Sequence, residues 1–189
     1  RALEIDADLP PAVRGDIAMI RSNVEREANL IDDLLDLTRI ANGRIQLQRR
    51  NFDAHQVLRE AIAVVHADPA SKCSTISVEL AAATHHIEAD SARIQQVFWN
   101  LIRNAVKFTP ADGRVEVRTD NPDPNTLRIR VSDNGIGIAP EALPKIFNAF
   151  EQGDPNIGQM FGGLGLGLAI SQALAQLHHG QLSAESAGL

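Results

Sequence analysis

The stretch Asp133-Asn134-Gly135-Ile136-Gly137-Ile138 follows residues 127–132, in which apolar and polar side chains alternate. That alternation predicts a β-strand with one buried face. One further step of the two-residue period places Asp133 on the apolar face. A carboxylate aimed at a core must be paired or hydrogen-bonded, because burying it alone is costly. The stretch therefore predicts either a capped turn after a strand or a turn whose glycines let the backbone approach a group that Asp133 faces.

Composition sets the class of protein. The chain has 189 residues, 44% hydrophobic and 22% charged, with a net charge of −6. These values are typical of a globular protein of one or two domains. The acidic balance argues against a nucleic-acid-binding surface. The single cysteine, Cys73, excludes an internal disulfide and a cysteine-based metal site. No apolar run approaches the roughly 20 residues of a membrane span, and the first residue is not Met, so we expect a cytoplasmic segment of a longer protein.

An apolar stripe with a seven-residue period predicts a long helix near the N-terminus. A proline at the first helical position begins this helix, and Asn42-Gly43 ends it. The stripe contains Ile17, Val24, Ile31 and Thr38, with Ile20, Ala28, Leu34, Leu35 and Ala41 at the interleaved positions. A helix of about 30 residues is longer than usual for a globular domain. We therefore expect an antiparallel hairpin or a dimeric bundle rather than a helix packed only on its own domain.

The remaining residues predict a unit of mixed helices and strands. The predicted strands are 44–48, 76–80, 86–89, 115–117, 127–132 and 181–185, and the predicted helices are 54–66, 91–108, 141–147 and 169–177. Asp53 and Asp90 are expected to cap the first two of these helices. The polar stretch 148–161 has no period and is long enough to form a mobile lid.

Polar side chains line up on the helix that Asp90 begins. Its predicted buried face contains Ile94, Val97, Phe98, Leu101, Ala105 and Phe108. The opposite arc carries Arg93, Asn100, Asn104 and Lys107. Such a row is usually a solvated surface. Beside an inward-facing aspartate and glycine-rich loops, however, amide oxygens and a lysine suit a phosphate group and a hard cation.

A glycine run, residues 162–168, leads directly into helix 169–177. Bare backbone N–H groups and the helix dipole both favour an anion such as phosphate at that point. The run is not a Walker loop, because no Gly-Lys-Ser/Thr follows, and it is not a dinucleotide fingerprint, because no strand precedes it.

Together these motifs resemble the kinase core of two-component sensor histidine kinases, in particular of the hybrid kind. Residues 100–109 are similar to the N box of that family, 133–138 to the G1 box, 146–151 to the F box and 163–168 to the G2 box. Residues 34–40 resemble the end of the second dimerisation helix.

The resemblance implies an α+β fold: a Bergerat-type α/β sandwich, with a mixed sheet covered by helices on one face, preceded by a long helix of a dimerisation hairpin or four-helix bundle. Residues 1–43 would belong to the hairpin and residues 44–189 to the catalytic ATP-binding domain. ATP and Mg²⁺ are the implied cofactors, with Asn104 and Asn100 as Mg²⁺ ligands and Asp133 as the acceptor for the adenine amino group. The implied ATP-binding residues are Asn100, Asn104, Lys107, Asp133, Gly135, Gly137, Phe147, Phe150, Gly163, Gly165, Leu166 and Gly167.

The same resemblance implies the reaction and the partners. The γ-phosphate of ATP would pass to a histidine on the dimerisation helix and then to an aspartate of a response-regulator receiver domain. A homodimer would form through residues 12–42, in the cytoplasmic part of a larger or membrane-attached sensor. No nucleic-acid partner and no membrane segment are expected within this chain.

Three features depart from the family pattern. No His-Asp/Glu-x-Arg/Lys-x-Pro box occurs around any of the six histidines, so the phosphoacceptor helix is expected upstream of Arg1 and no catalytic residue is assigned here. Leu164 stands where many members have Thr or Ser. The strand that normally closes the domain is also expected to be truncated in this chain.

Two alternatives come from other functional classes. Gyrase-like and mismatch-repair ATPases share the nucleotide fold but carry a glutamate as general base one helical turn before the Mg²⁺ asparagine. That position is Asn100 here, and an amide cannot take a proton from water, which favours a kinase. The other alternative is a non-catalytic nucleotide-sensing scaffold that dimerises through residues 12–42.

Overall fold

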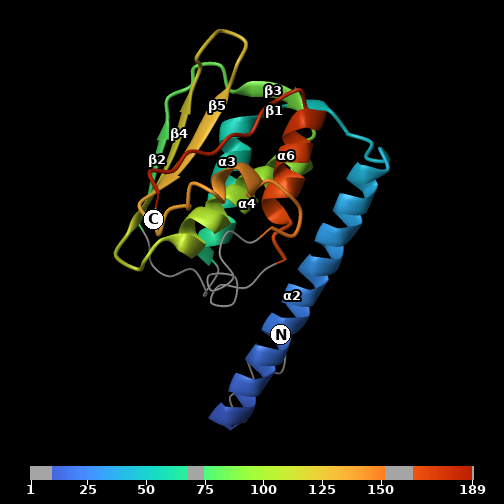
Figure 1. The fold of residues 1–189 in the computed structure, drawn as a ribbon, viewed down its shortest axis with the longest axis vertical. Helices are drawn as coiled ribbons and strands as arrows, with labels where there is room; N and C mark the ends of the chain where they lie inside the picture. The colour runs from blue at the N-terminus through green and yellow to red at the C-terminus, as the bar shows by residue number, and fades with distance from the viewer. Residues whose placement is uncertain (1–9, 68–74, 152–163, 189) are drawn as a thin grey trace.

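The computed structural model describes residues 10–67, 75–151 and 164–188, and begins with one long helix (Figure 1). Helix α2 (Pro11–Ala41) has 31 residues, with proline in its first turn. Its end is fixed by Asn42, whose side chain donates a hydrogen bond to the carbonyl of Thr38 at 2.7 Å. The predicted long helix and its boundary are therefore confirmed. No helix in the described ranges is long and apolar enough to cross a membrane.

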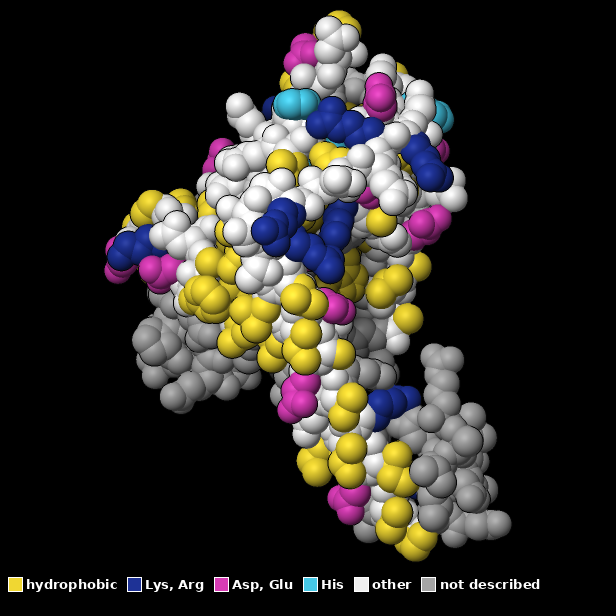
Figure 2. All heavy atoms as spheres, turned by 90° about the vertical axis from the view of Figure 1, so that its right-hand side faces the viewer, with side chains coloured by type: hydrophobic (Ala, Val, Ile, Leu, Met, Phe, Trp, Pro, Cys, Tyr) yellow, Lys and Arg dark blue, Asp and Glu magenta, His cyan; other side chains and the backbone are white. Residues whose placement is uncertain are grey.

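Much of the apolar stripe of α2 is exposed. Figure 2 shows hydrophobic side chains along the outward face of this helix. The exposed large hydrophobic residues of α2 are Val13, Met19, Ile20, Val24, Ile31, Leu34 and Leu35.

The strands form two small sheets. β2 (Thr75–Leu80), β4 (Arg114–Asp120) and β5 (Arg128–Asp133) make a three-stranded sheet in the order β2-β4-β5. β2 and β4 are parallel and β4 and β5 antiparallel, so the sheet is mixed, as the fold prediction requires. β1 (Arg50–Asp53) and β3 (His86–Ala89) pair antiparallel as a separate ribbon.

Helices cover one face of the three-stranded sheet (Figure 1). α3 (Ala54–Ala67) and α4 (Ser91–Phe108) pack there, and the core between helices and strands includes Leu58, Ile102, Val115 and Val117, each at most 1% exposed. This arrangement confirms the predicted α/β sandwich with its helices on one side.

A second apolar cluster lies on the other side of α4. Helix α6 (Gly167–Leu177) and its N-cap residue Leu166 pack on this side. Leu166, Ile170 and Leu174 cluster with Val97, and Leu37 and Ile40 of α2 pack onto the same cluster. The prediction that α4 has a single buried face is therefore wrong. The sheet side of α4 includes Ile102 and Val106, and Val97 faces α6 instead.

Three predicted elements differ in the structure. Residues 44–48 form no strand, and the backbone N–H of Gln48 instead donates to a carboxylate oxygen of Asp90 at 2.9 Å. The predicted helix 141–147 is only the short 3₁₀ helix η1 (Leu143–Lys145), because Pro144 lacks the N–H that a longer helix needs. Residues 181–185 form no strand. The segment 181–188 is held instead through the hydroxyl of Ser186, which accepts a hydrogen bond from the N–H of Ile138. Most of the predicted lid, 148–161, lies outside the described residues.

A histidine cluster joins β1, α3 and β4. As predicted, Asp53 caps α3, accepting hydrogen bonds from the backbone N–H of His55 at 2.8 Å and of Gln56 at 3.4 Å. His85 Nδ1 lies 2.8 Å from the same carboxylate, and the His85 ring stacks on His55 with centroids 4.2 Å apart. The buried His55 places Nε2 2.9 Å from the hydroxyl of Thr119. Burial, followed by the charge of His85, lowers the pKa of His55.

We predict that this cluster makes the fold sensitive to acid. A histidine whose pKa is lower in the folded state than its unfolded value of about 6.5 binds protons preferentially in the unfolded chain. Stability is therefore retained above about pH 6.5 and falls below it, by at most about 1.4 kcal/mol per pH unit for one such group. Urea unfolding between pH 7.5 and 5 should show this loss, and His55→Gln should reduce its slope.

The matched control is His66→Gln, which changes an exposed histidine in the last turn of the same helix. This variant should keep the wild-type slope. An unchanged slope in His55→Gln would show that His55 does not cause the acid sensitivity.

Candidate functional site

The four sequence motifs meet around helix α4. At its C-terminal end, the carbonyl of Phe108 accepts a hydrogen bond from the N–H of Ile136 in the turn after β5, at 3.2 Å. Further back, the side-chain nitrogen of Asn100 donates to the carbonyl of Gly167 at 3.2 Å. The N–H of Phe150 in turn donates to the carbonyl of Gly165, also at 3.2 Å. Motifs that are far apart in the sequence are thus linked by one continuous series of contacts.

Asp133 ends strand β5 on the face that the sequence predicts. In the antiparallel register Asp133 lies opposite Val115, and Val131 lies opposite Val117, so Asp133 shares a face with the core. The carboxylate is nevertheless exposed, because the strand ends at the edge of the apolar cluster. Its Oδ1 accepts a hydrogen bond from the N–H of Gly135 at 2.9 Å, which forms the expected capped turn. The expectation that this carboxylate is buried is therefore wrong, although its direction is correct.

Glycine is required at position 135 by a close approach of two backbone segments. A Cβ atom added there would lie 2.4 Å from the carbonyl oxygen of Phe108, and this distance is too short for any side chain. Gly137, two residues later, has a φ of +72°. The next N–H, that of Ile138, donates to the hydroxyl of Ser186 at 2.9 Å. The turn is therefore held on one side by α4 and on the other by the C-terminal segment.

Asn100 and Asn104 differ in their surroundings although they are one turn apart on α4. Asn100 is buried at 7% exposure, and its Nδ2 donates to Gly167 and to the hydroxyl of Ser171, at 3.2 Å each. The prediction of a solvated arc is wrong for Asn100, because α6 packs over it. Asn104 is half-buried, and within the described part of the chain its side chain makes no hydrogen bond.

Lys107 supplies a positive charge on the last turns of α4. Its ammonium lies 4.8 Å from the centre of the Phe108 ring, and the side chain is half-buried. Burial lowers the pKa of Lys107, and the charge of Arg103 lowers it further.

Gly165 of the glycine run lies close to the backbone of Glu151. Gly165 has a φ of +70°, and an added Cβ would lie 2.5 Å from the carbonyl oxygen of Glu151. Phe147 is half-buried and Phe150 is exposed. Gly163 lies outside the described residues. Within the described residues no side chain caps the start of α6, and the first N–H groups of a helix are of the kind that can bind an anion.

Leu166, one of the implied ATP-binding residues, is buried in the structure. Its side chain is 2% exposed and belongs to the apolar cluster between α4 and α6. The side chain therefore packs in the core. Any contact from this position would come from its backbone.

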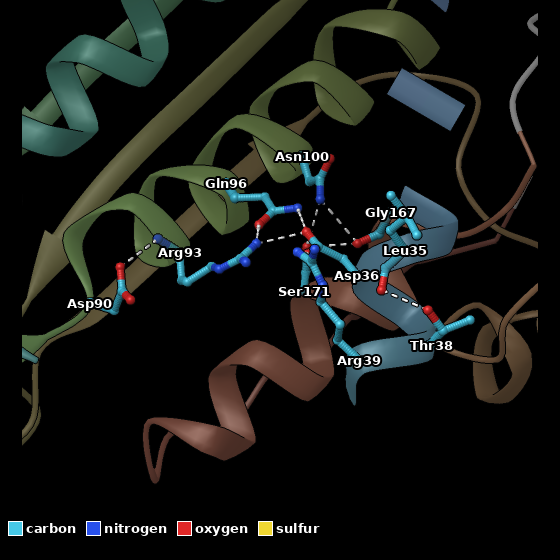
Figure 3. A network of polar contacts seen from close by, with 10 residues as sticks. All are labelled: Leu35, Asp36, Thr38, Arg39, Asp90, Arg93, Gln96, Asn100, Gly167 and Ser171. Carbon is cyan, nitrogen blue, oxygen red and sulfur yellow. Dashed lines mark hydrogen bonds and ion pairs between the residues drawn. The ribbon is translucent and has the colours of Figure 1, made fainter. Parts of the chain in front are cut away.

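A polar network that the sequence analysis missed connects α2 to α4 (Figure 3). Asp36 of α2 is buried, and its carboxylate accepts hydrogen bonds from Arg93 at 2.7 Å and from Gln96 at 2.9 Å. Arg93 is thus ion-paired and not simply solvated. Burial and the charge of Asp36 raise the pKa of Asp33 on the same helix. The sequence feature that could have predicted this network is an aspartate within an apolar stretch, Leu34-Leu35-Asp36-Leu37.

Comparisons with known proteins agree with this geometry. Residues 89–188 match the family described as histidine kinase-, DNA gyrase B- and HSP90-like ATPase. The histidine protein kinase DivJ of Caulobacter vibrioides is 35% identical over 158 residues, 84% of this chain and 26% of that protein. The sensor protein kinase WalK of Staphylococcus aureus is 34% identical over 182 residues, 96% of this chain and 43% of that protein.

A solved structure shows the same fold. The full-length structure of ShkA in complex with AMPPNP superposes with a TM-score of 0.73 at 30% identity, over 90% of this chain and 35% of that one. The chain thus spans less than half the length of each of these three proteins.

The matched family region includes α4, the turn after β5, the glycine run and α6, which are the parts that form the site. It covers 100 of the 189 residues, more than half of the chain. Two of the relatives are named as histidine or sensor protein kinases. The chain therefore belongs to the family of histidine kinase-, DNA gyrase B- and HSP90-like ATPases.

Proposed function

We propose that this domain binds ATP with Mg²⁺ and transfers the γ-phosphate to a histidine on a dimerisation helix, for relay to an aspartate of a response-regulator receiver domain. Two relatives are named as histidine or sensor protein kinases, and a 30% identical neighbour was solved with AMPPNP, which supports nucleotide binding here. The chain contains no histidine in the phosphoacceptor box, so the acceptor would come from another segment or chain.

The observation that carries the choice of a kinase is the environment of Asn100. Hydrolysing relatives of this fold use a glutamate at the corresponding place to take a proton from water. An amide cannot act as that base. The Asn100 amide is moreover bonded to Gly167 and Ser171 of α6, and so has a structural partner. A site without a base for water suits an enzyme that has to hold ATP until a histidine arrives.

The binding residues are assigned roles in this proposal, Leu166 through its backbone alone. Asp133 accepts a hydrogen bond from the adenine amino group, and the turn at Gly135 and Gly137 brings the backbone close to the base. Lys107 and the start of α6, which no described side chain caps, bind the phosphates together with Gly163, Gly165 and Gly167. Phe147 and Phe150 flank the nucleotide. Phosphoryl transfer requires mainly positioning and charge stabilisation, and these groups are of the kind that supplies both.

Mg²⁺ fits the two asparagines of α4. A hard cation prefers oxygen ligands, and the Asn104 side chain makes no hydrogen bond to other described residues. The nitrogen of Asn100 is held by α6, so its oxygen is the atom left to act as a ligand. The ion would neutralise charge on the phosphate oxygens.

The domain division and the partners belong to the same proposal. Residues 1–43 would form part of a dimerisation hairpin and residues 44–189 the catalytic domain. The exposed apolar residues of α2, among them Val24 and Ile31, support a homodimer through residues 12–42 (Figure 2). Since ATP is a cytoplasmic substrate, the domain would act in the cytoplasm.

Asp133→Asn should abolish or strongly weaken ATP binding while the fold is retained. The amide can present a donor where the adenine amino group already donates, so we expect a loss of at least about tenfold in affinity. Calorimetric titration with ATP measures this loss, and Asp123→Asn, in the loop at the far end of β4 and β5, is the matched control. Unchanged affinity in Asp133→Asn would refute its assignment to adenine.

Asn104→Ala should weaken ATP binding mainly when Mg²⁺ is present. The relevant quantity is the Mg²⁺ coupling ratio, defined as the dissociation constant of ATP in EDTA divided by that in saturating Mg²⁺. Loss of an oxygen ligand should lower this ratio by about tenfold, with little change in EDTA. Equal losses under both conditions would make Asn104 a packing residue.

The 189-residue chain alone should bind ATP but not phosphorylate itself. His178, for example, has both ring nitrogens engaged: Nε2 accepts from the N–H of Asp90 at 3.0 Å, and Nδ1 lies 2.8 Å from the carbonyl of Leu174. A nucleophilic nitrogen in line with the γ-phosphate has to be supplied. Incubation with γ-labelled ATP should give acid-labile, base-stable label only when a helix carrying the histidine box is added, and Asn104→Ala should abolish it.

Three other outcomes would count against the proposal. Label on the chain alone would show that one of its own histidines is an acceptor. Rapid release of free phosphate without a histidine helix would favour the hydrolase. Binding of ATP without transfer of phosphate to the added helix would favour the nucleotide-sensing scaffold.

A further inference from the structure

The hydroxyl of Ser171 is the most deeply buried polar group beside the proposed site. Ser171 is 0% exposed and lies between Ile170 and Leu174, both of the apolar cluster that joins α4 and α6. A hydroxyl in such a place is costly unless it is hydrogen-bonded. Its oxygen makes two bonds: it donates to the carbonyl of Gly167 at 2.7 Å and accepts from Nδ2 of Asn100 at 3.2 Å.

These bonds fix which way the Asn100 amide is turned. The carbonyl of Gly167 can only accept, so the group that Asn100 presents to it at 3.2 Å has to be the amide nitrogen. The single hydrogen of Ser171 is committed to the same carbonyl, so towards Asn100 the hydroxyl can only accept. Two partners on α6 therefore require the same orientation of the amide (Figure 3).

The amide oxygen is consequently placed on the side of the glycine run. Among the atoms around Gly167, the one nearest to an added Cβ is Oδ1 of Asn100, at 3.3 Å, with Nδ2 at 3.7 Å. Because a helical Cβ points towards the helix N-terminus, the oxygen lies towards the start of α6 and the glycines before it. Glycine at position 167 leaves room for this oxygen.

We propose that Ser171 is a positioning residue for Mg²⁺ binding, which holds the Asn100 amide so that its oxygen, and not its nitrogen, faces the metal. The inference rests on the proposed function, in which Asn100 and Asn104 bind Mg²⁺. Asn104 makes no hydrogen bond among the described residues, so its orientation is set by the ion when it binds, whereas Asn100 is oriented in advance. Groups that hydrogen-bond to a metal ligand and so orient it commonly change metal affinity by about ten- to a hundredfold.

The coupling ratio defined above for Asn104→Ala tests this role. Ser171→Ala removes one of the two bonds that orient Asn100, so it should lower the Mg²⁺ coupling ratio by about tenfold while ATP affinity in EDTA stays within about twofold of the wild type. Ser171→Cys keeps the buried volume but offers only a weak hydrogen-bonding group, and it should lower the ratio in the same direction. It also serves as the second variant if the alanine variant does not fold.

Thr119→Val is the control for destabilisation alone. It removes another buried hydroxyl, 1% exposed and bonded to His55, far from the glycine run. This variant should lower the melting temperature but leave the coupling ratio unchanged. If Ser171→Ala and Ser171→Cys both keep the wild-type ratio, or lose affinity equally in EDTA and Mg²⁺, the positioning role is refuted. If the wild-type protein itself shows no Mg²⁺ dependence, the proposed metal site fails and this inference fails with it.

Discussion

The packing of α6 against α4 is the constraint on which the site depends. Leu166, Ile170 and Leu174 bury their side chains against Val97, and this apolar contact brings the start of α6 over the middle of α4. Since the sheet core already covers the opposite side of α4, no polar group between the two layers can remain unpaired without a penalty. The bonds of Asn100 to α6 and of Arg93 to Asp36 satisfy that requirement. The arrangement of hydrogen bonds and ion pairs at the site therefore follows from where the apolar side chains pack.

Features set by residues close together in the chain were predictable from the sequence. The caps at Asp53 and Asp90 depend on N–H groups two or three residues ahead. The end of α2 depends on Asn42 and the residue four positions before it. The direction of Asp133 follows from the two-residue period of β5, and the capped turn from the glycine two residues later. Each of these interactions is local, so the residue types and their spacing were sufficient.

Features that depend on pairing between distant segments were not predictable in the same way. Asn100 was expected on a solvated arc because its own helix cannot reveal that α6, about 70 residues later, covers it. The ion pair of Arg93 joins residues 57 positions apart. At 44–48, where a strand was expected, the N–H of Gln48 bonds instead to Asp90, a contact 42 positions away. Exposure of Asp133 likewise depends on where the core ends and not on the strand period.

The junction between α4 and α6 also bears on the kind of reaction. A glutamate at position 100 would place a carboxylate against the carbonyl of Gly167, which has no hydrogen to donate. Oxygen atoms without a hydrogen between them repel, and a buried carboxylate with no donor is costly. In this chain the junction therefore requires a donor at position 100, and an amide meets that need. The same amide that stabilises the junction cannot act as a general base for water. In the proposed kinase, helix packing and the preference for transfer over hydrolysis would therefore have one physical origin.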